Sequence, residues 1–68
     1  MPTVTVEGPP IKDLDTKRSL TKEITDALER AYKIPREAYV VVIKENPHEN
    51  VSVGGELICD RIQRREGS

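Results

Sequence analysis

The sequence predicts an α/β (α+β) fold: one strand-helix-strand (βαβ) unit with a short C-terminal hairpin or arm, assembled into an oligomer. Two β-branched segments, residues 3–7 and 39–43, flank a stretch whose apolar residues recur with helical spacing. The chain has 68 residues, of which 35% are hydrophobic and 34% charged. Such a chain buries too little apolar surface to be stable alone, so we expect self-association. No linker or repeat divides it, and residues 1–68 are expected to form a single domain.

The first strand is expected at residues 3–7, where β-branched residues alternate with period two, as in a half-buried strand. Gly8, Pro9 and Pro10 should end this strand, because consecutive prolines offer no amide donors to a neighbouring strand.

A helix is expected from Asp13 or Asp15 to Lys33. Either aspartate could cap its N-terminus. The sequence Ile34-Pro35 should stop the helix, because a residue that precedes proline is pushed out of the α region. Its apolar face is expected to comprise Leu20, Ile24, Ala27, Leu28 and Ala31.

The second strand is expected at residues 39–43, whose continuous run of apolar residues is typical of a strand covered on both faces. The two strands should be parallel and joined by a right-handed crossover. Residues 51–58 are interpreted as a short hairpin or turn around Gly54-Gly55, followed by a polar tail. The βαβ unit leaves two strand edges open, and an open edge favours pairing with a second copy.

Composition argues against several classes of function. The net charge is −1 and aromatic residues are scarce, which disfavours nucleic acid as a partner. No apolar run approaches the ~20 residues that span a bilayer, so no membrane is expected. Cys59 is the single cysteine, which excludes an intrachain disulfide and, without a Cys/His cluster, disfavours a metal. An unpaired cysteine fits a reducing compartment, and we expect a cytoplasmic protein.

The order of these elements, together with two short motifs, resembles a known family. Met1-Pro2 followed by a strand, a helix, a second strand and the sequence Val53-Gly54-Gly55-Glu56-Leu57 is similar to the 4-oxalocrotonate tautomerases. The resemblance implies a tautomerase-like fold and a homo-oligomer, most often a hexamer built as a trimer of dimers. It implies an isomerase that moves a proton on small enol or keto unsaturated carboxylic acids, with no cofactor.

The resemblance makes Pro2 the candidate catalytic residue, and its chemistry supports that role. After removal of Met1, Pro2 carries a secondary amine on a rigid ring. Ordinary α-amines titrate near pH ~7.7–8.0, and partial burial lowers that value further. Such an amine can both accept and return a proton at neutral pH. The simpler interpretation is a proline that merely begins a strand.

Lys12 is the candidate substrate-binding residue, because it aligns with the first arginine of the family. It would attract a carboxylate as a point charge; as a simpler alternative, it is a solvated loop lysine. The family's second arginine is replaced by Val40. Arg36 and Tyr39 are near this position, but the alignment supports neither as a substitute. The aromatic position before the glycine pair holds Val51.

Related enzymes that hydrate or dehalogenate unsaturated acids carry a carboxylate where this chain has Val53, so hydrolytic chemistry is disfavoured. Other ionisable residues are expected to be solvated, to anchor a turn in the case of Glu56, or to pack at an interface; a salt bridge between subunits is the alternative for the arginines. They are Glu45, His48, Glu49, Glu56, Cys59, Arg61, Arg64 and Arg65. The alternative function is a catalytically lapsed oligomer that acts as a scaffold or small-molecule binder.

Overall fold

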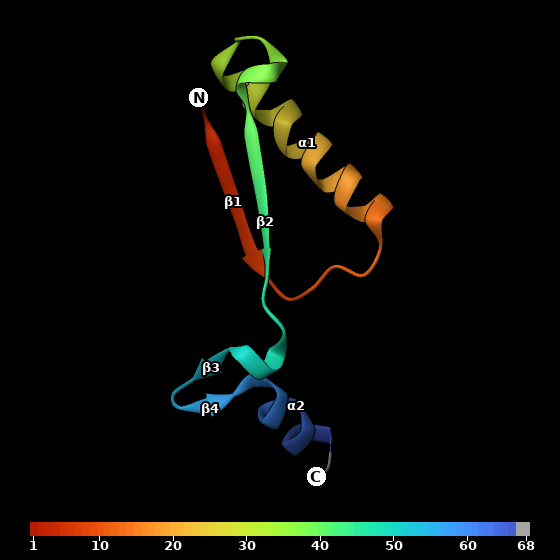
Figure 1. Ribbon diagram of the computed structural model, residues 1–68, viewed down its shortest axis with the longest axis vertical. Coiled ribbons are helices and arrows are strands. Elements are labelled where there is room, and N and C mark those ends of the chain that lie inside the picture. The colour runs from red at the N-terminus through yellow and green to blue at the C-terminus, as the bar shows by residue number, and fades with distance from the viewer. Residues whose placement is uncertain (67–68) are drawn as a thin grey trace.

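The computed structural model describes residues 1–66 and shows an elongated molecule with two parts (Figure 1). The body, residues 3–45, contains β1, α1 and β2; the arm, residues 46–66, extends from one end of it. The radius of gyration is 16.3 Å, whereas a compact domain of this length has about 11 Å. The elements in order are β1 (Thr3–Gly8), α1 (Leu14–Tyr32), the 3₁₀ turn η1 (Arg36–Ala38), β2 (Val40–Glu45), the 3₁₀ turn η2 (His48–Asn50), β3 (Ser52–Val53), β4 (Glu56–Leu57) and α2 (Ile58–Glu66).

The body confirms the predicted βαβ unit. Strands β1 and β2 are parallel, and their register runs from Thr3 opposite Val40 to Gly8 opposite Glu45. The residues of the two strands that face α1 are half-buried, whereas Val42 on the other face is 38% exposed. Within the described residues, β2 is thus covered on the face toward α1 only, and the cover predicted for its second face is not found in the single chain.

Helix α1 begins as predicted at one of the two candidate caps. Asp13 is the N-cap, and its carboxylate accepts a hydrogen bond from the backbone N–H of Asp15 (3.2 Å). At the other end Lys33 adopts a left-handed conformation (φ 57°) and donates its N–H to the carbonyl of Glu29 (2.9 Å). The helix therefore ends at Tyr32.

The apolar face of α1 is narrower than predicted. Leu20, Ile24 and Leu28 are half-buried, but Ala27 and Ala31 are exposed. The physical reason is the width of the sheet, because two strands ~5 Å apart cannot cover a whole helix face.

Tyr39 lies before β2 rather than in it, and it is the one buried hydrophobic residue among residues 1–66, with 9% of its surface exposed. Its hydroxyl donates to the carbonyl of Ile34 (3.1 Å) and accepts from the N–H of the same residue (3.2 Å). Its ring also contacts that of Tyr32, with centroids 6.4 Å apart. Tyr39 thereby fixes the turn that leads from α1 into β2.

The arm contains the predicted hairpin, in which β3 and β4 pair antiparallel across Gly54 and Gly55. Both glycines have positive φ (62° and 86°), which a two-residue hairpin turn requires. The predicted polar tail is wrong, because residues 58–66 form helix α2. Its helical signal is the spacing of Ile58 and Ile62 by four residues. Residues 67 and 68 of that tail lie outside the described part.

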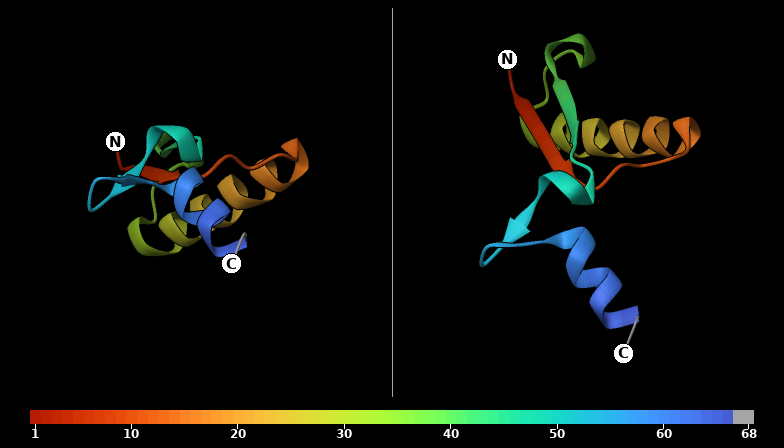
Figure 2. Two further views of the ribbon diagram at one scale, coloured as in Figure 1. Left: turned by 90° about the horizontal axis from the view of Figure 1, so that it is seen from below. Right: turned by 60° about the horizontal axis from the view of Figure 1, so that its bottom comes forward.

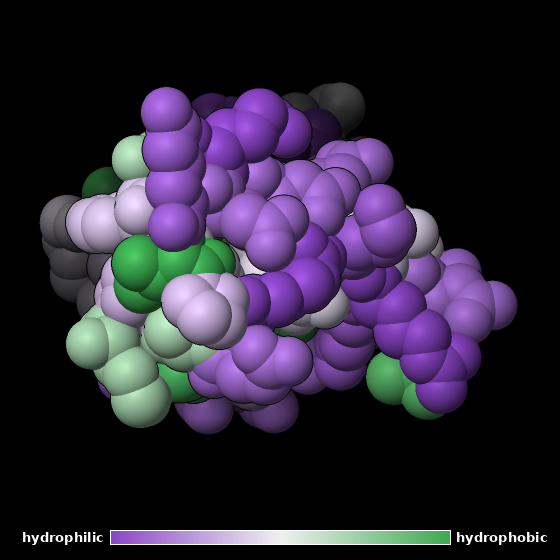
Figure 3. Space-filling model, turned by 90° about the horizontal axis from the view of Figure 1, so that it is seen from above, coloured by the Kyte–Doolittle hydropathy of each residue, from purple (hydrophilic) through white to green (hydrophobic). Residues whose placement is uncertain are grey.

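Much apolar surface is left uncovered, and Figure 3 shows hydrophobic side chains exposed at the upper end of the molecule. Across residues 1–66, no helix is both long and apolar enough to cross a bilayer. The exposed large hydrophobic residues are Met1, Leu14, Tyr32, Ile34, Val42, Val53, Leu57 and Ile62.

Candidate active site

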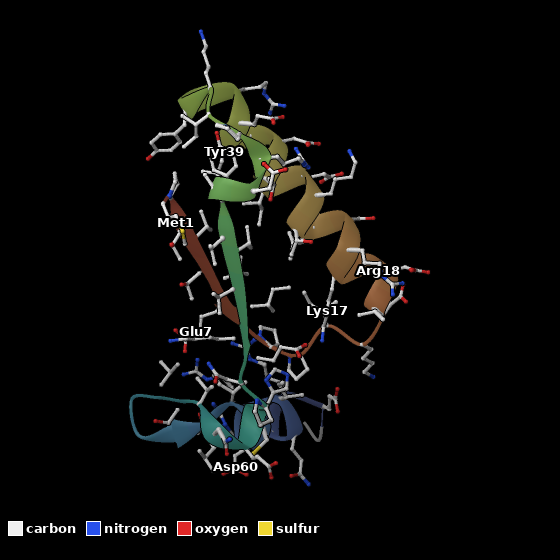
Figure 4. All side chains as sticks on the ribbon, turned by 45° about the horizontal axis from the view of Figure 1, so that its top comes forward. Met1, Glu7, Lys17, Arg18, Tyr39 and Asp60 are labelled. Atoms are coloured by element: carbon white, nitrogen blue, oxygen red, sulfur yellow. The ribbon has the colours of Figure 1, made fainter. Side chains whose placement is uncertain are left out.

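Pro2 is held in place by its carbonyl group rather than by its nitrogen. The backbone N–H of Val40 donates to the carbonyl oxygen of Pro2 (3.0 Å), and the residue is half-buried. Met1 is 87% exposed, and its carbonyl accepts a hydrogen bond from the hydroxyl of Thr3 (3.4 Å); Figure 4 labels it at the start of β1. Loss of Met1 therefore disturbs little packing. It would free a secondary amine whose ring is already anchored.

Lys12 lies at the opposite end of β1 from Pro2. It is exposed in the loop between β1 and α1, and no hydrogen bond or ion pair holds its ammonium within residues 1–66. Strand β1 has six residues, so it spans roughly 20 Å at ~3.3 Å per residue. A single chain does not bring Pro2 and Lys12 together.

The two residues considered as substitutes for the missing arginine are both engaged elsewhere. The guanidinium of Arg36 pairs with Asp26 (2.9 Å) and Glu29 (3.3 Å). Hydrogen bonds from Lys22 and then Arg36 hold the pKa of Asp26 below its usual value. The hydroxyl of Tyr39 forms hydrogen bonds with the backbone N–H and carbonyl of Ile34. Within the chain, both side chains therefore already have partners other than a ligand at the start of β2.

Glu45, expected to be a solvated acid, instead fastens the loop that carries Lys12. Its carboxylate accepts hydrogen bonds from Lys17 (2.8 Å) and from the backbone N–H of Ile11. These two donors, Lys17 first, lower the pKa of Glu45. Glu45 therefore ties the loop to the end of β2, and Lys12 is displayed from an anchored segment.

Arg61 and Arg64 of α2, expected to be solvated or to bridge subunits, form ion pairs within the chain. Arg64 donates two hydrogen bonds to the carboxylate of Glu56 (3.0 and 3.1 Å), and Arg61 lies 3.5 Å from it. Arg64, more than Arg61, lowers the pKa of Glu56. Glu56 is thus an anchor, as one interpretation held, but it anchors the hairpin to α2.

A hollow opens where the body meets the arm, at the bend that Figure 2 shows between β2 and the C-terminal elements. Val51, at the aromatic position of the family, lines it. His48 is exposed, as predicted, yet it also lines the hollow, and no pattern in the sequence indicates this placement. The hollow lies at the Gly8 end of β1, so it is remote from Pro2 of the same chain. Its lining residues are Glu7, Gly8, Pro9, Asn46, His48, Asn50, Val51, Ser52 and Ile58.

Residues 1–66 contain no group of three or more His, Cys, Asp or Glu side chains placed to hold a metal ion. Cys59 is half-buried in the first turn of α2, where its sulfur lies 4.0 Å from the carboxylate of Asp60.

Comparison with known proteins gives a consistent answer. The family model described as "Tautomerase enzyme" matches residues 2–61, whereas no curated protein matches significantly. DmpI from Archaeoglobus fulgidus is 39% identical, with 87% of this chain and 100% of that chain covered and a TM-score of 0.75. TomN, a 4-oxalocrotonate tautomerase homologue of the tomaymycin biosynthetic pathway, is 25% identical, with coverages of 98% and 100% and a TM-score of 0.79.

A heterohexameric 4-oxalocrotonate tautomerase from Chloroflexus aurantiacus shares the fold at 20% identity, with coverages of 88% and 97% and a TM-score of 0.74. The family model matches most of this chain. The structural matches span nearly the whole length of each solved protein. The chain belongs to the 4-oxalocrotonate tautomerase family of the tautomerase superfamily.

Proposed function

We propose that the protein is an isomerase in which the amine of Pro2, once Met1 is removed, serves as general base and then as general acid. One observation carries the proposal. The carbonyl oxygen of Pro2 accepts a hydrogen bond from β2, so the position of the residue does not depend on its nitrogen. Family membership supports the reaction type. The substrate would be a small enolisable or unsaturated carboxylic acid, and the proton would move between carbon and oxygen.

The half-burial of Pro2 bears on how its freed amine would act. Partial burial disfavours an ammonium ion, and the half-buried ring places the nitrogen at the boundary of the sheet. A base must be free of its proton to accept one from substrate, and it must hold that proton weakly enough to return it.

The proposed site needs a second copy of the chain. Helix α1 packs on β2, which leaves β1 as the less covered strand with an open edge (Figure 1). Two-fold dimers are the commonest assemblies, and a two-fold axis normal to the sheet pairs β1 antiparallel with β1 of the second copy. This joins the two pairs into a four-stranded sheet with both helices on one face.

The alternation of side chains restricts the register of that pairing. Apolar residues must stay on the helix face, and a slip by one residue would turn them to the other face. Two allowed registers each pair five residues of β1, one with Thr5 opposite Thr5 and the other with Val6 opposite Val6. We propose the first, in which Val4 lies opposite Val6. Pro2 of one copy then lies opposite Gly8 of the other, whose missing side chain leaves space for the ring. In the structure, a Cβ at Gly8 would have nothing within 4 Å.

This arrangement brings the proposed site residues together from different copies. Pro2 of one copy would reach the end of β1 where the second copy has its hollow and its Lys12 loop. Lys12 would then supply a positive charge for the substrate carboxylate. The uncovered sheet face around Val42 would be closed by further dimers, and we propose a homohexamer. The heterohexamer of the same fold from Chloroflexus aurantiacus supports that size.

The proposal is tested with Met-free protein, verified by intact mass, in a ketonisation assay with phenylenolpyruvate. Pro2→Ala should lower kcat/KM by at least about 100-fold, the usual loss when a positioned base is removed. Pro10→Ala, an exposed loop proline, is the matched control and should keep parental activity. Sedimentation should show the same oligomer for all three proteins. Equal turnover by Pro2→Ala and its parent would overturn the proposed role.

A scaffold or small-molecule binder without catalysis is the second candidate. It is favoured by the ion pairs of Arg36 and the hydrogen bonds of Tyr39, which leave Val40 without a cationic substitute. Met-free protein that assembles but ketonises no enol acid would identify this second function. Retention of Met1 in the protein purified from its own cell would do so too, because the nitrogen of Pro2 would then remain an amide.

A further inference from the structure

The hollow between the body and the arm lies next to the proposed reaction centre. Its volume is about 680 Å³, within the ~300–1,000 Å³ usual for ligand pockets. Gly8 is part of its wall, and in the dimer proposed above Pro2 of the second copy lies opposite Gly8. A substrate that exchanges a proton with that amine would therefore extend into the hollow.

The proposed reaction places negative charge on an oxygen of the substrate. In ketonisation, the amine of Pro2 takes the proton of the enol hydroxyl, which leaves an enolate. The resulting ammonium ion gives this proton to the carbon at the far end of the double bond, and the oxygen becomes a carbonyl group. A hydrogen-bond donor directed at this oxygen stabilises the transition state more than the substrate.

Fixed positive charge is absent from the described lining of the hollow, which contains neither lysine nor arginine. Lys44 lies beside Glu7 in the register of β1 and β2, on the sheet rather than in the lining. Lys12, the proposed partner of the substrate carboxylate, lies in the loop before α1 and also outside the lining. The donor to the enolate oxygen is therefore sought among the lining residues themselves.

His48 is the lining residue best suited to this role. It is the single histidine of the chain, and no hydrogen bond or ion pair holds its ring within residues 1–66. Even an uncharged imidazole can polarise a substrate carbonyl group through its N–H. The amide of Asn46 already donates to Glu7 (2.8 Å). Asn50 and Ser52 also line the hollow, but neither side chain can take up a positive charge.

The backbone around His48 is held in place. The N–H of Asn50 donates to the carbonyl of Pro47 (2.8 Å), which closes the turn η2 that carries His48. The turn also packs against α2. An imidazole on an anchored turn can be directed at one point of the hollow, as stabilisation of a developing charge requires.

We propose that the imidazole of His48 donates an N–H hydrogen bond to the enolate oxygen while Pro2 of the second copy moves the proton. The proposal rests on the proposed function and adds a second catalytic residue to it. Each site then combines the amine of one copy with the imidazole of the other. The hydrogen bond does the work that a cationic side chain would otherwise do at this oxygen.

Kinetics of Met-free protein with phenylenolpyruvate test this role. His48→Leu should lower kcat by about 100-fold with little change in KM, because the hydrogen bond is strongest in the transition state. His48→Gln keeps an N–H donor and should be about tenfold faster than His48→Leu. Glu49→Leu, the next residue of the same turn, is exposed and outside the lining. It is the matched control and should keep the parental kcat.

A second measurement reports on His48 without turnover. Oxalate is planar, resembles the enolate of an α-keto acid, and cannot be ketonised. Because the chain has one histidine, the imidazole ¹⁵N NMR signals of untagged, Met-free protein come from His48 alone. Oxalate should shift one of these signals in the parent and in Glu49→Leu. An unchanged imidazole spectrum at saturating phenylenolpyruvate and oxalate would overturn the proposal.

The kinetic outcomes also separate this proposal from the role of Pro2. Parental kcat in His48→Leu, a change in KM alone, or an equal loss in Glu49→Leu would overturn the proposed hydrogen bond. So would a His48→Gln variant as slow as His48→Leu. If Pro2→Ala is inactive while His48→Leu is fully active, the role of Pro2 stands and this proposal fails. If oxalate shifts the imidazole signals while Pro2→Ala ketonises as its parent does, contact of His48 with the ligand is supported and the role of Pro2 is contradicted.

Discussion

In the body, β1 and β2 share six register pairs, whereas β3 and β4 in the arm share two. The body is also fastened by a buried side chain, Tyr39. The arm is held instead by the exposed ion pairs of Glu56 with Arg61 and Arg64, and by the N–H of Ile58 bonded to the carbonyl of Val51 (2.8 Å). The body therefore has long backbone pairing and a buried side chain, whereas the arm has a short hairpin, the packing of α2 on η2 and β4, and exposed ion pairs.

This contrast indicates which parts of the chain would benefit most from contact with a second copy. The closest packing occurs within the body or within the arm, not between the two. In the proposed oligomer, an arm with so little support of its own would gain stability by lying against a neighbouring subunit, and the open face of the body would gain it in the same way. The sequence prediction of self-association thus agrees with the incomplete core of both parts.

The largest effect is expected from a substitution on the sheet face of the body that we propose is buried between dimers. Val42, 38% exposed on the sheet face remote from α1, should be buried between dimers in the hexamer. Val42→Lys would bury an unpaired charge there at a cost of several kcal/mol, so the hexamer should dissociate into smaller species in sedimentation velocity. Ser19→Lys, at an exposed position of α1, should sediment as the parent does. An intact hexamer for Val42→Lys would contradict the proposed assembly.

A smaller effect, on the free energy of unfolding, is expected at Tyr39, the buried side chain of the body. Tyr39→Phe removes the hydroxyl that satisfies both backbone groups of Ile34, and the free energy of unfolding should fall by about 1–3 kcal/mol. Urea denaturation at fixed protein concentration measures it. Tyr32→Phe is the control, because Tyr32 is 57% exposed and should lose less than about 0.5 kcal/mol. Equal losses would mean that the hydroxyl of Tyr39 contributes no more to stability than the exposed hydroxyl of Tyr32.

The elements of the body could be predicted because their signals are local. Alternating valines, helical spacing and the capping Asp13 each specify one element, and the glycine pair specifies the hairpin. Helix α2 was missed, because its few apolar residues are outnumbered by charges and its support comes from Glu56, outside the helix. The extra exposure of Ala27 likewise depends on the width of a two-stranded sheet, which no single segment encodes.

Less of the candidate site than of the fold could be predicted from the sequence. Pro2 and Lys12 could be named from chemistry and family resemblance, and their roles stay predictions. Their separation along β1 follows from the parallel register and required the structure. The hollow could not be foreseen, because it joins Glu7 to residues some 40 positions away through the Asn46 contact. Contacts between such distant residues follow from the packing of whole elements, not from spacing.

The smallest expected effect concerns the charges of the arm. It is measured as the hydrogen-exchange protection of α2 compared with that of the body. Hydrogen bonds from Arg64 keep the pKa of Glu56 below its usual value of 4.5. A carboxylate whose pKa is lowered on folding contributes stability above its unfolded pKa, and this contribution is lost as pH falls through the folded pKa. Below about pH 4.5, the amides of α2 should therefore lose hydrogen-exchange protection before those of β1 and β2.

Glu56→Gln should remove most of that pH dependence from α2, because the amide cannot titrate and pairs weakly with Arg64. Glu45→Gln is the matched variant in the body, since its carboxylate also has a lowered pKa, set first by Lys17. It should loosen the loop before α1 while β1 and β2 stay protected by their six register pairs. Simultaneous loss of protection in α2 and β2 on acidification would show that the arm and the body unfold as one unit, and the contrast drawn between them would fail.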